Sequence, residues 1–172
     1  MEKNTHSDPR IGIDIGRVIM APVKGGRADT SFLRGDMAQA MRMPPSPGAL
    51  EGVRDLVAAF AGQAWLISKA GPTVQAKTMK WFDHWDFYAT TGLPKDRVRF
   101  CLRRWQKAEH CREVKITHFI DDRLDVLEHL RDLVPRLYLF GEQPGHDGSP
   151  DWVTPVLDWR QTTAAILHDL GR

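Results

Sequence analysis

Short apolar runs alternate along the chain with longer segments in which apolar residues recur every three or four positions. The short runs predict five β-strands and a sixth, short edge segment, at residues 10–15, 63–68, 97–101, 116–122, 136–140 and 154–159. The longer segments predict helices over residues 46–60, 71–85, 107–114, 123–134 and 160–170. Strands separated by helices favour right-handed crossovers. The order therefore predicts an α/β fold, a three-layer Rossmann-like parallel sheet with helices on both faces.

Local signals mark the starts of two of these helices. Ser46 is placed to cap the helix of residues 46–60, and Pro47 then falls in its first turn. Pro72 marks the start of the next helix, whose apolar face includes Trp81 and Trp85. We expect both tryptophans to lie in the core.

The chain is predicted to form a single domain over residues 11–172, preceded by a flexible polar tail at residues 1–10. Residues 20–46 are the longest segment that shows neither the apolar runs of strands nor the apolar spacing of helices, and we expect them to be irregular. We expect this segment to form a small lid inserted into the domain, with Gly25 and Gly26 as its hinge. The apolar residues of this lid either line a pocket or, in the favoured interpretation, pack onto the core: Phe32, Met37, Met41 and Met43.

Composition narrows the function classes. Hydrophobic residues make up 42% of the 172 residues and the formal net charge is +2, so no global field drives the chain onto nucleic acid or a membrane. No apolar run approaches the roughly 20 residues of a membrane-spanning helix, and the N-terminus lacks the apolar segment of a signal peptide. We therefore expect a cytoplasmic protein without a membrane partner, in which Cys101 and Cys111 are reduced.

Polar side chains follow three of the predicted strands at the point where each strand ends. Asp14 ends the first strand, Ser68 the second, and the pair Asp121 and Asp122 the fourth. In a parallel sheet these ends meet at one edge, where ligands gather. A helix-capping aspartate or a turn serine would account for each residue alone. Together, clustered carboxylates repel one another unless a cation lies between them, and their hard oxygen ligands suit Mg²⁺.

This arrangement indicates phosphoryl chemistry. Asp14 is placed as a nucleophile or a metal ligand, and Gly16 allows close backbone approach, so that its carbonyl can also bind the metal. Ser68 is placed to donate a hydrogen bond to a phosphoryl oxygen. Lys107 starts a short predicted helix before the acidic strand and is placed to balance the developing charge.

One basic cluster precedes that lysine, in the segment DRVRFCLRRWQK. Its arginines and lysine surround Trp105: Arg97, Arg99, Arg103, Arg104 and Lys107. The cluster either grips a nucleotide or a nucleic-acid end, with the tryptophan stacked on a base, or is a solvated loop whose arginines pair with nearby acids. The second interpretation is favoured.

Four motifs in order resemble those of the haloacid dehalogenase-like (HAD) hydrolase superfamily. They are the segment GIDIGRVI with Asp14, the segment AWLIS ending in Ser68, Lys107, and the acidic pair in THFIDDR, over residues 11–140. The segments PPSPGALEGVRDL and YLFGE with VLDWRQTTAAIL are similar to the small 5'-deoxyribonucleotidase branch. The resemblance implies a HAD-like fold with a minimal cap at about residues 20–46.

The resemblance also implies a role for each matched residue, with Asp14 as the nucleophile. It implies a Mg²⁺ site formed by Asp14, the Gly16 carbonyl, Asp121 and, through water, Asp122. It also implies contacts with the phosphoryl group or the substrate from Ser68, Lys107 and Arg17. Lys69, next to the second motif, is a further candidate, although its side chain is expected to point elsewhere.

The chain departs from the family pattern at Gly16. Family phosphatases carry a second aspartate there, which protonates the leaving group, and such help contributes ~10²–10⁴-fold in rate. Three interpretations stay open: a reaction that does not need the acid, dehalogenase or phosphonatase chemistry, or a site that binds phosphate or metal without turnover. Arg17 replaces the usual glycine and either contacts a phosphate or lies on the surface.

These observations predict a Mg²⁺-dependent HAD-type phosphatase that hydrolyses a phosphomonoester through an aspartyl-phosphate at Asp14. In one version of this prediction, the phosphomonoester resembles a nucleotide. Its partner would be a small phosphorylated substrate, with a nucleic-acid end as the less favoured alternative. The alternative function is a catalytically weak or inactive HAD-fold module that binds phosphate or metal in a regulatory role.

Overall fold

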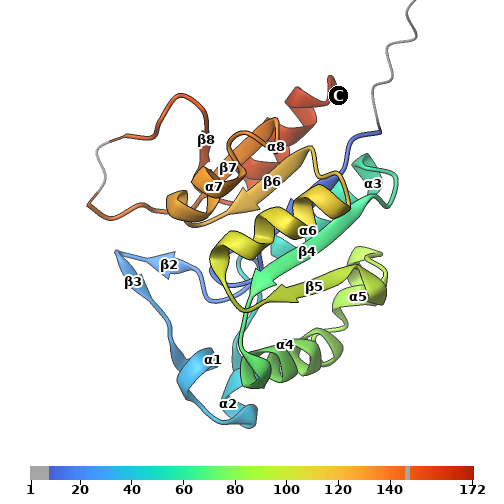
Figure 1. The fold of residues 1–172 in the computed structure, drawn as a ribbon. Helices are drawn as coiled ribbons and strands as arrows, with labels where there is room; N and C mark the ends of the chain where they lie inside the picture. Colours follow the sequence, from blue (N-terminus) through green and yellow to red (C-terminus); the bar gives the residue numbers. More distant parts are fainter. Residues whose placement is uncertain (1–7, 146–147) are drawn as a thin grey trace, which may run out of the picture.

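Six parallel strands form the central sheet of the computed structural model, which describes residues 8–145 and 148–172 (Figure 1). Across the sheet they follow the order β5-β4-β1-β6-β7-β8. Their bounds are β1 Ile11–Ile13, β4 Ala64–Lys69, β5 Val98–Cys101, β6 His118–Asp121, β7 Arg136–Phe140 and β8 Thr154–Val156. Every neighbouring pair is parallel, which confirms the predicted sheet, and β8 takes the predicted edge position.

Burial on both faces explains why the central strands are almost wholly apolar. β1 is buried at every position, and so is β4 apart from its last residue, Lys69. In β1 the packing is so close that a Cβ on Gly12 would lie 2.5 Å from the ring of Phe119 in β6. Glycine is therefore required in the middle of the strand that leads to the candidate site.

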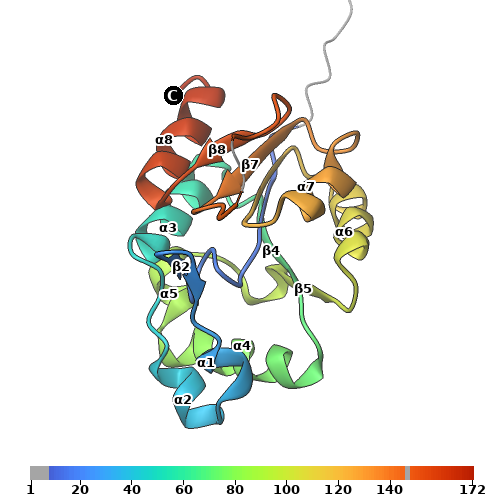
Figure 2. The same ribbon diagram turned by 90° about the vertical axis from the view of Figure 1, so that its left-hand side faces the viewer.

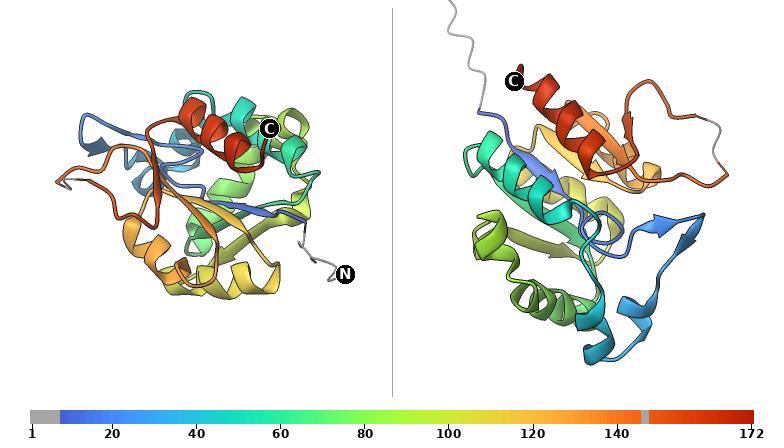
Figure 3. Two further views of the ribbon diagram at one scale, coloured as in Figure 1. Left: turned by 90° about the horizontal axis from the view of Figure 1, so that it is seen from above. Right: turned by 180° about the vertical axis from the view of Figure 1, so that it is seen from behind.

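Helices cover both faces of the sheet, which confirms the predicted three layers (Figure 2). Their bounds are α3 Ala49–Ala59, α4 Pro72–His84, α5 Phe87–Thr91, α6 Lys107–Glu113, α7 Leu124–Leu130 and α8 Trp159–Asp169. One apolar cluster joins the sheet to α3, α4, α5 and α8. A second cluster, on the opposite face, joins it to α6 and α7, and Figure 3 shows the two helix layers on either side of the strands.

Two helix boundaries differ from the sequence prediction. The helix predicted from residue 46 starts at Ala49, and Ser46 does not cap it: the Ser46 Oγ is buried without a hydrogen-bond partner, and its carbonyl accepts the Ala49 N–H at 2.9 Å. The prediction was wrong because the turn at Gly48, with φ of 75°, delays the helix. α7 ends at Leu130 rather than at residue 134, although Val134 remains buried.

Residues 20–46, predicted to be irregular, contain regular elements. A two-stranded hairpin, β2 Val23–Lys24 and β3 Arg27–Ala28, is followed by the short helices α1 Ser31–Arg34 and α2 Met37–Arg42. Figure 3 shows the hairpin extending away from the sheet, whereas α1 and α2 lie beside α4. This part of the prediction was wrong because these elements depend on contacts with distant residues.

Side chains of α4, together with that of Trp85 directly after it, hold the backbone of α1 and α2 in place. The Lys77 ammonium group is buried and donates to the carbonyls of Phe32, Leu33 and Gly35 at 3.3, 3.2 and 2.6 Å. The indole N–H groups of Trp81 and Trp85 donate to the Met43 and Met41 carbonyls at 2.7 and 3.2 Å. The two helices are thus fixed to the body of the molecule.

The expected core residues of this segment divide between two environments. Phe32 and Met43 are buried in the core, and Met41 packs against it, whereas Met37 is half-exposed. Trp81 is fully buried, and Trp85 is partly buried against the same cluster.

Of the predicted tail, residues 1–7 lie outside the described part of the chain. Arg10 is bonded through its backbone N–H to Thr117 at 2.8 Å. Within the described residues, no helix combines the length and apolar character needed to cross a membrane.

Candidate active site

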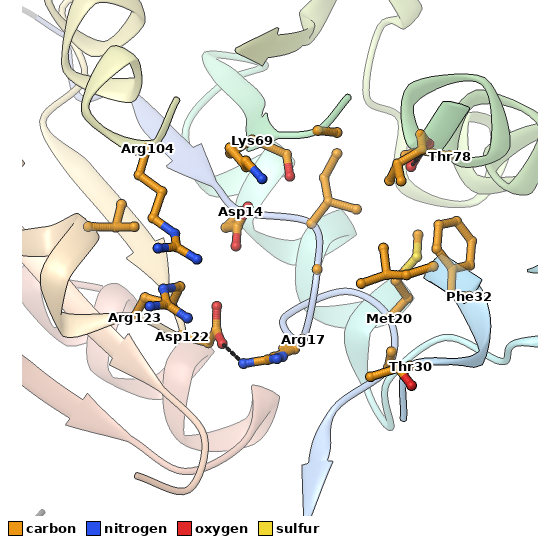
Figure 4. Close-up of a pocket in the computed structure, with 18 of the residues that line it drawn as sticks. Asp14, Arg17, Met20, Thr30, Phe32, Lys69, Thr78, Arg104, Asp122 and Arg123 are labelled. Atoms are coloured by element: carbon orange, nitrogen blue, oxygen red, sulfur yellow. Dashed lines mark hydrogen bonds and ion pairs between the residues drawn. The ribbon is translucent and has the colours of Figure 1, made fainter. Parts of the chain in front are cut away.

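The residues predicted at the strand ends meet at the carboxyl edge of the sheet. Asp14 follows β1, and its backbone N–H donates to the Ile120 carbonyl of β6 at 2.9 Å. Ser68 lies near the end of β4, and Asp121 is the last residue of β6. A cavity of about 200 Å³ opens at this edge, and Asp14, Ser68 and Asp122 are among the residues that line it (Figure 4).

Lys107 lies at the centre of the charge network. As the first residue of α6, it extends its ammonium group to Asp14 Oδ1 at 2.9 Å and to Asp121 Oδ2 at 2.7 Å. The side chain of Lys107 is 3% exposed, that of Asp121 0% and that of Asp14 9%. Burial alone would lower the pKa of Lys107, but Asp121 and Asp14 together hold it above its ordinary value. Lys107 therefore stays charged.

Three carboxylates form an acidic cluster beside this lysine. Asp14, Asp121 and Asp122 each offer an oxygen, and these oxygens lie within 4.8 Å of one another. Burial, reinforced by the neighbouring Asp14, raises the pKa of Asp122 to about 6. Burial raises the pKa of Asp121 too, although Lys107 opposes the shift. The site therefore concentrates more negative charge than its lysine balances.

The oxygens of Asp121 already have protein partners. One accepts from Lys107, and the other accepts the Arg123 backbone N–H at 3.0 Å. Asp122, in contrast, faces the cavity together with Asp14. Asp121 is thus placed to fix the lysine, and Asp122 to meet a ligand.

Gly16 and Arg17 form the turn that follows the candidate nucleophile. A Cβ built on Gly16 would meet no atom within 4 Å, so a side chain would fit there. Arg17 has a positive φ of 62°, in the left-handed region that side-chain-bearing residues rarely adopt. Its guanidinium lies 3.7 Å from Asp122 Oδ2 and reaches the cavity wall. Arg17 therefore lies at the site as well as at the surface.

Lys69 and Ser68 both line the cavity, from the end of β4. Ser68 is buried, whereas Lys69 is exposed, and Figure 4 shows its side chain extending toward Asp14. This differs from the expectation that Lys69 points elsewhere.

The basic cluster divides into two parts. Arg97 lies over the Trp65 ring at 4.3 Å, and Arg99 pairs with Glu113 at 2.8 Å. Arg104 and Lys107, in contrast, line the cavity. The cluster therefore splits between local pairing and the candidate site.

Sequence reasoning missed several cavity residues. Arg123 was not singled out, although its position directly after the acidic pair was a usable signal. Asp29, Thr30 and Leu33 come from the segment before α1 and from α1 itself, and no local pattern places them there. Phe32 also lines the cavity while packing onto the core, so both readings of that residue hold.

Known structures with the same arrangement identify the fold. A D,D-heptose 1,7-bisphosphate phosphatase from Burkholderia thailandensis superposes with a TM-score of 0.59 over 92% of this chain and 98% of its own, at 14% identity. A haloacid dehalogenase-like family hydrolase from Xanthomonas campestris gives 0.58 over 93% and 95%, at 12% identity. The fold is haloacid dehalogenase-like. No protein-family model and no curated protein matches the sequence.

The HAD-like fold agrees with the order of the four sequence motifs. At 14% and 12% identity these neighbours show the fold alone, and they do not show the 5'-deoxyribonucleotidase branch. The function is therefore argued from the site itself.

Proposed function

We propose that this protein is a Mg²⁺-dependent HAD-type phosphatase that hydrolyses a phosphomonoester through an aspartyl-phosphate at Asp14. The observation that carries the proposal is the buried lysine between two carboxylates, Asp14 and Asp121, beside an open cavity. An ordinary buried ion pair needs one acid for each base. Here two bases, Lys107 and Arg17, face three clustered carboxylates, which suits a site that also holds a cation.

The donor set fits Mg²⁺. Carboxylate oxygens are the ligands this ion prefers, and those of Asp14, Asp121 and Asp122 lie within 4.8 Å of one another. Burial first, and the neighbouring Asp14 second, raise the pKa of Asp122, and a divalent cation would offset the repulsion between these two acids. We propose these residues and the Gly16 carbonyl as the metal site. When bound, Mg²⁺ would screen the repulsion between Asp14 and an anionic phosphoryl group.

The protein's own residues divide the work of the reaction. Lys107 binds Asp14 Oδ1, so Asp14 Oδ2 is the oxygen left to form a bond with phosphorus while the ester P–O bond breaks. Ser68 and Lys107 are placed to hold the phosphoryl oxygens. Attack of water on the aspartyl-phosphate then releases inorganic phosphate and regenerates the Asp14 carboxylate.

The chain offers no proton donor for the leaving oxygen at position 16, where family phosphatases carry an aspartate. Gly16 carries no proton donor, and the space beside it is open. The proposed substrate therefore has either a leaving group that departs as an anion or a proton donor of its own.

The segment at residues 20–46 is proposed to be a minimal cap within a single domain. Phe32 and Thr30 form part of the cavity wall opposite Arg104 and Arg123 (Figure 4), and Leu33 also lines the cavity. Since the cavity is about 200 Å³, it suits a small phosphorylated molecule, a nucleotide among them, better than a nucleic-acid end.

The test is a phosphatase screen with Mg²⁺ over sugar phosphates, nucleotides and aryl phosphates. The wild-type protein should release phosphate, and both Asp14→Asn and removal of Mg²⁺ with a chelator should abolish the release. Activity that survives in Asp14→Asn would overturn the proposal.

The absence of an acid at Gly16 favours a second candidate, a regulatory module that binds phosphate or metal without turnover. Mg²⁺-dependent phosphate binding in calorimetry, with no release from any substrate in the screen, would support this module instead.

A further inference from the structure

Two arginines stand at the mouth of the candidate site without a catalytic task. Arg104 lies in a 3₁₀ turn before α6, and Arg123 follows the acidic pair at the end of β6. Both line the same cavity as Asp14, and Figure 4 shows their guanidinium groups side by side. Their side chains are 46% and 38% exposed, so a ligand can reach them from the cavity.

One carboxylate holds both arginines in place. Asp125 accepts from Arg123 through two hydrogen bonds, Nε to Oδ1 at 3.0 Å and Nη2 to Oδ2 at 3.1 Å. Arg104 Nη1 lies 3.6 Å from the same Oδ2. Asp125 therefore orients two like charges toward each other, against their mutual repulsion.

The charge balance of this pair differs from that of the other cations at the site. Lys107 is matched by Asp14 and Asp121, and Arg17 faces Asp122. Arg104 and Arg123 share one carboxylate, and no second carboxylate of residues 8–145 and 148–172 lies within 4.0 Å of either guanidinium. The pair keeps one unbalanced positive charge and several free N–H donors at the cavity wall.

We propose that Arg104 and Arg123 form a second anion subsite, so that the substrate carries a second phosphate apart from the phosphoryl group transferred at Asp14. This inference rests on the proposed function and names its substrate class. Guanidinium groups bind such anions through paired, charge-assisted hydrogen bonds, which here would orient the substrate's far end.

The experiment compares alkyl monophosphates with α,ω-alkanediol bisphosphates of three, four and six carbons. At the best spacing the bisphosphate should exceed the matched monophosphate in kcat/KM by about 10- to 100-fold, the range expected when charged hydrogen bonds are added. Arg104→Ala and Arg123→Gln should each reduce this ratio toward one. Arg103→Ala removes an equal charge from a neighbouring exposed residue that does not line the cavity, and it should keep the ratio.

Calorimetry separates failure of this subsite from failure of the proposed function. Calorimetric titration with the same compounds in Mg²⁺ measures binding without turnover. If nothing is hydrolysed but the bisphosphates still bind more tightly in an Arg104-dependent way, the phosphatase proposal fails and the anion subsite stands. Equal kcat/KM and equal Kd for the two series, or a preference that Arg104→Ala and Arg123→Gln leave unchanged, would overturn the subsite.

Discussion

Gly16 leaves open space beside the candidate nucleophile, and Arg17 next to it adopts a left-handed backbone. These two residues distinguish this site from the family pattern. The strand-end residues Asp14, Ser68 and Asp121 could be placed from sequence alone, because the ends of parallel strands meet at one edge. The orientation of the Arg123 side chain could not be predicted, because it depends on Asp125 in the following helix.

Gly16→Asp should turn on the missing proton transfer. Its side chain has room, since a Cβ at Gly16 meets no atom within 4 Å. We expect kcat for an alkyl phosphate, whose leaving group needs a proton, to rise by about 10²-fold, the lower end of general acid catalysis. Steady-state kinetics with phosphate detection measures this directly.

Gly16→Asn is the matched control, because it has nearly the same size and no acidic proton. It should leave kcat for the alkyl phosphate near the wild-type value. Equal rates for the aspartate and asparagine variants would show that proton donation at this position is not what the site lacks.

Lys107→Met should destabilise the protein strongly. The change leaves Asp14 and Asp121 buried without their shared cation, and breaking such a buried network costs ~3–5 kcal/mol. Urea unfolding should show this loss, and millimolar Mg²⁺ should recover part of it by binding the folded state. Lys69→Met, which removes an exposed lysine from the same cavity, should unfold like the wild type. A Lys107→Met variant whose unfolding free energy matches that of the wild type would show that the buried charges are not coupled as described.

The elements that surround the sheet show where sequence patterns stop being informative. The helices α4 and α8 carry enough apolar residues to be predicted nearly to their ends. The segment of residues 20–46 is not predictable in this way, because α1 and α2 are too short to be stable alone. Their backbone carbonyls are held by donors that lie more than 30 residues away, on α4 and at Trp85 directly after it.

Lys77→Met should release α1 from α4. The variant loses three hydrogen bonds from a buried ammonium group to the carbonyls at the end of α1. We expect hydrogen exchange in residues 31–43 to become faster by about 10-fold or more, since each bond to a charged group contributes ~1.5–3 kcal/mol. KM for the phosphorylated substrate should also rise in this variant, because Phe32 and Leu33 line the cavity.

Lys80→Met is the control on the same helix, where the lysine is exposed. It should leave exchange in residues 31–43 at the wild-type rate. Unchanged exchange in both variants would mean that α1 and α2 are held by apolar packing alone.

At the scale of the whole molecule, a buried polar residue, His118, lies within the apolar layers of the fold. His118 begins β6, packs edge-on against Phe60 of the C-terminal turn of α3 and stacks on Tyr138 of β7. The alternation of strands and helices was enough to predict the layers and the parallel sheet. It also placed His118 in a predicted strand, at residues 116–122, but it could not predict its aromatic neighbours Phe60 and Tyr138, which β6 acquires only on folding.

Protonation of His118 should destabilise the fold in acid. Burial lowers the pKa of His118 to about 4, from an ordinary value of 6.5. The unfolded chain therefore binds a proton that the folded chain resists, so this contribution is complete above pH 6.5 and is lost as the pH falls toward 4. His118→Asn should flatten that part of the curve of unfolding free energy against pH. His129→Asn, at an exposed position, should keep the wild-type slope, and identical curves for His118→Asn and the wild type would contradict the prediction.

The most direct test of the central claim is a crystal structure grown with Mg²⁺ and beryllofluoride, which mimics a phosphoryl group on a carboxylate. The site described here predicts beryllium bonded to an Asp14 oxygen, with Lys107 and Ser68 on the fluorides and Mg²⁺ held by Asp14, the Gly16 carbonyl and the acidic pair. Beryllofluoride bonded elsewhere, or bound equally by Asp14→Asn, would contradict the assignment of Asp14 as the residue that carries the phosphoryl group.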